Sequence, residues 1–183
     1  MNQDICTLLC DNGLMFRAKK IRAFLTVSAS AIVLSMPLAR AEMASPDAFR
    51  RGLTAYNMGE FRNAAKIWSR LARKGSGNAQ SGLGVLYYTG AGVPRDFVHA
   101  HELFLAAAKQ NIPEALMFLS LMYRRGEGVP QSYLMSYMWC DIAVGVGHEG
   151  ASYTCPLIAE NMTGANVLKA QKLSSAWRNH HFE

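Results

Sequence analysis

The chain has 183 residues, half of them hydrophobic, and a formal net charge of +6. From Glu42 onwards, 14 Lys and Arg residues stand against 11 Asp and Glu residues. This small excess, spread along the chain, excludes the dense basic surface on which nucleic-acid binding depends. No nucleic-acid partner is therefore expected.

The first 41 residues are expected to form a signal peptide. A basic stretch (residues 17–22) precedes an apolar run (about 23–36), and Ala39-Arg40-Ala41 then supplies a cleavage site. Met15 is a candidate for the true start. The apolar run is shorter than the ~20 residues that a membrane span needs. We expect a periplasmic or secreted protein, without stable membrane insertion after cleavage; the alternative is an uncleaved signal anchor.

After cleavage, residues 42–183 are expected to form a single repeat domain. Its first helix pair is expected at 45–75, with Ser45 as the cap of the first helix. Gly59-Glu60 makes a short turn, and Gly52, Gly59, Phe61, Ala64 and Trp68 follow a spacing that resembles a tetratricopeptide unit. The array is thus expected to begin before the clearest repeats.

Residues 78–111 and 114–147 carry one pattern twice, at an offset of 36. The matching pairs are Ala79/Ala115, Leu83/Leu119, Tyr87/Tyr123, Gly90/Gly126, Gly92/Gly128, Val93/Val129, Pro94/Pro130 and Ala107/Ala143. A fixed period in this range is typical of stacked-repeat proteins. Each copy is expected to form two helices, because its apolar residues recur at helical spacing on both sides of a glycine-rich loop.

The segment LGVLYYTGAGVPRDFVHAHELFLAAAKQN resembles the Sel-1-like repeat, a relative of the tetratricopeptide repeat. The second copy departs from the pattern at Ser120, Ser132 and Ser136, where the first has Gly84, Asp96 and Ala100. The resemblance implies an all-α fold: a right-handed solenoid of antiparallel helix pairs. It also implies a protein or peptide partner, bound by an adaptor, regulator or scaffold.

Residues 148–179 are expected to form a terminal half-repeat and a capping helix. Pro156 is expected to lie early in the helix of the half-repeat and to force a ragged start or a kink. Thr163 is a good cap for the last helix. The inward stripe of that helix is expected to contain Val167, Ala170, Leu173 and Trp177.

Cys140 and Cys155 are expected to form a disulfide. Cys140 occupies the place of Phe104 and Trp68, and Cys155 occupies that of Leu119 and Leu83, so the two should face each other across a helix pair. An exported chain would meet an oxidising compartment, where disulfides persist. The alternative is a pair of reduced core cysteines.

No catalytic residue, metal ligand or cofactor is expected. The chain contains neither a G-x-S-x-G nor an H-E-x-x-H motif, and its glycine loops end helices rather than begin them. His99 and His101 are two residues apart and point to different sides of a helix. Some secreted Cys-rich relatives are linked to β-lactam binding or hydrolysis, so such an enzyme is one alternative; a structural subunit of an envelope assembly is another.

A partner-binding groove is expected along the first helix of each pair, on the side away from Leu83 and Tyr87. Arg124 and Arg125 could form either a basic helix end or a clamp for an acidic ligand. The Met-rich third unit could fill a core or adapt to partners. The expected groove residues are Phe49, Leu53, Tyr56, Asn78, Ser81, Val85, Tyr88, Glu114, Met117, Leu121 and Arg124.

Overall fold

The computed structural model describes residues 46–181, which belong to one of the chain's two units, residues 37–183. This part contains eight α-helices and no strand, so the predicted all-α class is confirmed. The predicted signal peptide, the Met15 start and the Ser45 cap lie outside the described residues. The helices are α2 (Pro46–Asn57), α3 (Phe61–Ala72), α4 (Gly77–Thr89), α5 (Phe97–Ala108), α6 (Pro113–Arg125), α7 (Tyr133–Gly145), α8 (Ala151–Ala159) and α9 (Gly164–His181).

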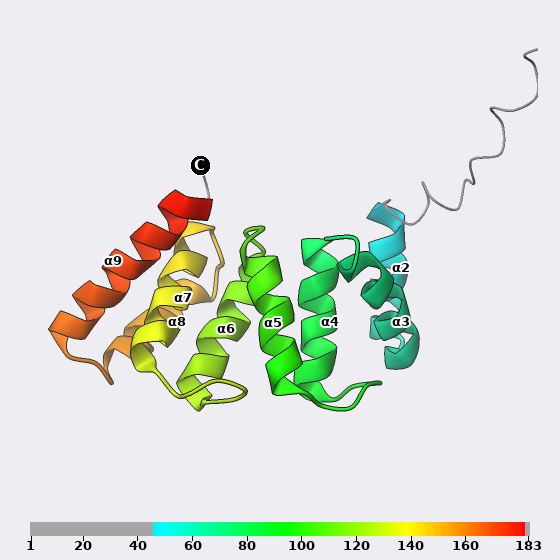
Figure 1. The fold of residues 1–183 in the computed structure, drawn as a ribbon, viewed down its shortest axis with the longest axis horizontal. Coiled ribbons are helices and arrows are strands. Elements are labelled where there is room, and N and C mark those ends of the chain that lie inside the picture. Colours follow the sequence, from blue (N-terminus) through cyan, green and yellow to red (C-terminus); the bar gives the residue numbers. More distant parts are fainter. Residues whose placement is uncertain (1–45, 182–183) are drawn as a thin grey trace, which may run out of the picture. The chain divides into compact units, whose positions relative to one another are not determined.

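The helices stack in chain order as antiparallel pairs (Figure 1). The pairs are α2/α3, α4/α5 and α6/α7, and each helix from α3 to α7 packs on the one before it. The half-repeat α8 follows, and α9 packs mainly on α7. The predicted solenoid of helix pairs is confirmed.

Equivalent residues end and begin the helices of the two clearest repeats. Gly90 and Gly126 are left-handed at the ends of α4 and α6, with φ of 77° and 72°. The Asp96 carboxylate then accepts a hydrogen bond from His99 N, and Ser132 Oγ accepts one from Met135 N. Ser132 therefore replaces Asp96 as a cap without loss of the bond that starts the helix.

Two glycines of α4 let large side chains of the helices before and after it, Trp68 of α3 and Phe104 of α5, pack closely. A Cβ at Gly84 would lie 2.7 Å from Phe104 Cε1, and one at Gly82 would lie 3.0 Å from the Trp68 ring. Burying one such side chain contributes about 1.5–3 kcal/mol. In the α6/α7 pair, Ser120 takes the glycine position, and its hydroxyl donates to the Ser136 carbonyl at 2.8 Å.

A disulfide joins Cys140 of α7 to Cys155 of α8, which is the pair that the repeat register predicts. The two Cα atoms are 5.7 Å apart, and both residues are buried. The bond fixes the half-repeat to the preceding pair. Pro156 lies in the second half of α8 and not early in it, so its predicted position is wrong, whereas a kink at this residue stays a prediction.

The capping helix α9 is held by its predicted cap and by a polar contact. Thr163 Oγ1 accepts from Asn166 N at 3.3 Å, as predicted. The prediction of Leu173 in the inward stripe is wrong, because Leu173 is exposed and Ser174 is fully buried. Ser174 is inward since its hydroxyl donates to the Asp141 carboxylate of α7, which also lies 3.6 Å from Arg178.

Candidate functional site

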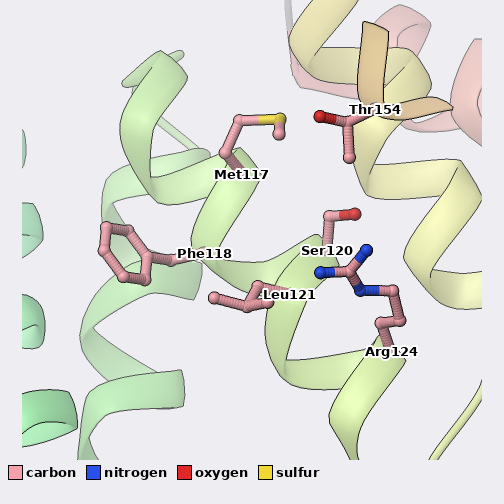
Figure 2. A pocket seen from close by; sticks show the side chains of 6 residues that line it. All are labelled: Met117, Phe118, Ser120, Leu121, Arg124 and Thr154. Carbon is pink, nitrogen blue, oxygen red and sulfur yellow. The ribbon is translucent and has the colours of Figure 1, made fainter. Parts of the chain in front are cut away.

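Two adjacent hollows open along the first helices of the pairs. The larger encloses about 410 Å³ and is lined mainly by α2, α4 and the beginning of α6. The smaller encloses about 220 Å³ and lies between α6 and α8 (Figure 2). We call the two hollows, which share the wall residue Phe118, the groove. The larger is lined by Phe49, Leu53, Tyr56, Trp68, Asn78, Ser81, Gly82, Val85, Ile112, Glu114 and Phe118; the smaller is lined by Met117, Phe118, Ser120, Leu121, Arg124 and Thr154.

The structure brings ten of the eleven expected groove residues into these walls. The seven in the larger hollow are Phe49, Leu53, Tyr56, Asn78, Ser81, Val85 and Glu114. The three in the smaller hollow are Met117, Leu121 and Arg124. Tyr88 lines neither hollow. The first helices of successive pairs therefore line one surface.

Tyr88 has a different position, because its side chain belongs to the packing between repeats. Its hydroxyl donates to Glu127 Oε2 at 2.5 Å and accepts from Arg125 Nη1 at 3.1 Å. Its ring packs edge-on against Phe97 and Phe118. Burial, and then the hydrogen bond to Glu127, raise the pKa of the Tyr88 hydroxyl.

Phe118 separates the two hollows, and the sequence prediction did not include it. Its ring stacks on Phe104, with the centroids 4.7 Å apart and the planes at 4°. Gly82, Phe118 and Thr154 all line hollows and are spaced by 36 residues. The repeat offset could therefore have identified this row of residues.

Two residues of α8 occupy repeat positions equivalent to groove residues of α6. The sequence prediction did not include them. Tyr153 and Leu157 follow Met117 and Leu121 by 36 residues. They are 80% and 57% exposed, unusually high for large apolar side chains. The same offset that paired Cys155 with Leu119 would have added both residues.

The charges of the groove lie at opposite ends of α6. Glu114 lines the larger hollow near the beginning of the helix, and Arg124 lines the smaller one near its end. The methionines of the Met-rich unit lie in two environments: Met122 and Met138 are buried in the core, while Met117 lines the smaller hollow.

The histidines do not form a metal site in the described part of the chain, where no three His, Cys, Asp or Glu residues come together. His99 lies 3.3 Å from Glu102, whereas His101 packs edge-on against Tyr123. Burial lowers the pKa of His101, and nearby Glu102 opposes this shift. Among the same residues, no helix is both long enough and apolar enough to span a membrane.

Comparison with known protein families finds the Sel1 repeat twice, at residues 77–112 and 113–144. These ranges contain the α4/α5 pair and most of the α6/α7 pair, together with the glycine loops inside each pair. No curated protein gives a significant match to the chain.

Two solved structures have a similar fold. One is c5321, a protective antigen of uropathogenic Escherichia coli strains with an SLR fold: TM-score 0.73, 23% identity, 77% of this chain covered. The other is a Sel1 repeat protein from Oxalobacter formigenes: TM-score 0.58, 23% identity, 76% of this chain covered. This chain spans 31% of the first protein and 63% of the second. At this identity the similarity concerns the fold.

Proposed function

Because this chain is a Sel1 repeat protein, a class that generally serves protein–protein interaction, we propose that it binds an extended segment of a partner protein in the groove. The chain then acts as an adaptor, regulator or scaffold. Its mechanism is geometric: stacked helices hold a preformed surface, and the partner supplies the side chains that fill the hollows.

The observation that carries this proposal is the shared lining of the two hollows by successive first helices. Leu53 is 41% exposed, and Phe49, Tyr56 and Val85 are only partly buried around the larger hollow. Clustered apolar side chains that remain open to water are typical of interaction sites. Aromatic side chains are also frequent binding anchors. The groove thus offers apolar contacts to a segment that crosses the helices.

Selection of peptides on the full chain tests this proposal. A displayed library of seven-residue peptides should yield binders, and Leu53→Glu should weaken them, because it places a charge in the larger hollow. Val98→Glu is the matched control, since Val98 is 59% exposed on α5 and lines neither hollow. Failure to obtain binders, or equal loss of binding in both variants, would contradict groove binding.

We also propose that the protein works outside the cytoplasm, in the periplasm or after secretion. The order of a basic stretch, an apolar run and Ala39-Arg40-Ala41 supports export. The pairing of Cys140 with Cys155 suits an oxidising compartment. Mass spectrometry of the protein from its own cell envelope should find Glu42 at the N-terminus. A protein that retains residues 23–36 would contradict cleavage.

A further inference from the structure

We propose that the smaller hollow recognises a carboxylate, namely the side chain of an Asp or Glu residue in a peptide bound in the groove. Arg124 is the residue that binds it. This inference rests on the proposed function and specifies its ligand chemistry. It follows from the different situations of two neighbouring arginines.

Arg125 is already occupied by contacts within the protein. Its Nη1 donates to Tyr88 Oη at 3.1 Å and lies 3.8 Å from Glu127 Oε1. The Arg124 side chain has neither a hydrogen bond nor an ion pair with any residue of the described part. It is only partly exposed and lines the smaller hollow. A guanidinium in this position carries five N–H donors that a ligand can use.

The direction of the Arg124 side chain argues against a role at the helix end. A basic residue that served the last carbonyl groups of α6 would extend towards the end of the helix. Figure 2 instead shows the guanidinium folded back along α6, beside Ser120 and on the side of Thr154 in α8. A carboxylate bound there would lie about one helical turn before the C-terminal end of α6. The negative end of the helix dipole would repel it less there than at the last residues of the helix.

The other wall groups leave Arg124 as the donor for a ligand. The hydroxyl hydrogen of Ser120 goes to the Ser136 carbonyl, and that of Thr154 goes to the Gly150 carbonyl at 2.8 Å. Met117 and Leu121 supply apolar walls. A carboxylate matches the planar guanidinium with two parallel hydrogen bonds, and apolar surroundings strengthen such bonds.

Glu114 adds a direction to the bound segment. It lines the larger hollow and lies ten residues before Arg124 on the same helix, which corresponds to ~15 Å. An extended peptide covers that length in about five residues. The expected ligand therefore has an acidic residue at Arg124, apolar residues over Phe118, and a basic residue about five positions away at Glu114. Glu114 is exposed, so its contribution is expected to be the smaller one.

The test compares peptide selection on four forms of the full chain, with the same seven-residue library. The unchanged chain should enrich Asp or Glu at one position. Arg124→Gln should remove that preference and lower the affinity of a selected acidic peptide about tenfold, while Arg125→Gln should keep both. Arg124→Glu should replace the acidic preference by a basic one. Thermal unfolding of each variant verifies that it is folded.

Several results would overturn the inference. Binders without an acidic preference, or an acidic preference that survives in Arg124→Gln, would refute carboxylate recognition while groove binding stands. Recovery of no peptide at all would refute both proposals. Inorganic phosphate that displaces the acidic peptide at low millimolar concentration from the unchanged chain, but has no effect in Arg124→Gln, would identify a simple anion site instead.

Discussion

The Tyr88 hydroxyl lies 2.5 Å from Glu127 Oε2 and thereby ties α4 to the glycine-rich loop of the next repeat. Arg125 joins the same contact from the end of α6. Successive pairs are thus connected by a polar link as well as by apolar packing. Since nearest-neighbour contacts determine the stability of such arrays, this link should have a measurable effect on unfolding.

Tyr88→Phe should lower the free energy of unfolding by about 1–2 kcal/mol, because a hydrogen bond to a charged group is lost. Tyr123→Phe is the matched control: Tyr123 is also half-buried, and its hydroxyl has no hydrogen-bond partner in the described residues. Urea unfolding measures both variants. The double variant Tyr88→Phe/Glu127→Gln should lose less free energy of unfolding than the two single variants together. An equal loss would show that the two side chains do not interact.

Reduction of the disulfide should destabilise the end of the array. Closing a loop of about 15 residues stabilises by ~3 kcal/mol in the entropic model. Cys140→Ala/Cys155→Ala should therefore unfold at lower urea concentration than the oxidised chain. To count thiols, Cys6 and Cys10 are replaced by Ser, and the protein is unfolded without reductant and labelled. No thiol should react; two reactive thiols per chain would disprove the bond in solution.

His101 should make the protein less stable in mild acid. Burial lowers its pKa below the ordinary 6.5. Below pH ~6.5 the unfolded chain binds a proton here more readily than the folded chain, so the free energy of unfolding falls from there towards the lowered pKa. In His101→Phe this decrease in the free energy of unfolding with falling pH should disappear, whereas His99→Phe should keep it. Urea titrations across that range decide; identical slopes in His101→Phe and the unchanged chain would refute the assignment.

Gly92→Ala should destabilise more than Gly147→Ala. Both glycines have left-handed backbones, with φ of 73° and 83°, which costs a residue with a Cβ about 1–2 kcal/mol. Only at Gly92 would the Cβ also meet backbone, 2.5 Å from the carbonyl carbon of Phe61. The extra strain is expected to add about 1–3 kcal/mol. Equal midpoints of urea unfolding for the two variants would show that the loop between α4 and α5 moves away from Phe61 without added strain.

Leu157→Glu should weaken binding of a selected groove peptide, because Leu157 has the register of Leu121 and extends the surface onto α8. Leu168→Glu is the control, with a similarly exposed side chain on α9: 62%, against 57% for Leu157. Both should change stability by less than about 0.5 kcal/mol, as is usual for exposed positions. Unchanged affinity in Leu157→Glu would place the end of the groove at Thr154.

The repeat offset predicted the features that depend on register. It identified the helix pairs, the facing positions of Cys140 and Cys155, and most of the groove lining. It could not predict contacts made by side-chain length and direction, such as the reach of Tyr88 to Glu127. The prediction placed Leu173 on the inward stripe of α9, but Ser174 is the buried residue because its hydroxyl donates a hydrogen bond to Asp141. A pattern of apolar residues does not show which polar residue has a buried hydrogen-bond partner.

The bond between Cys140 and Cys155 also has a consequence in time. It attaches α8, a nine-residue helix with an internal proline, to α7. Thr154, beside Cys155, forms one wall of the smaller hollow. A newly made chain in a reducing cytoplasm would hold this wall without the covalent link, so that the hollow would reach its full rigidity only after oxidation. On the proposed route of export, tight partner binding would then begin after the protein has left the compartment in which it is made.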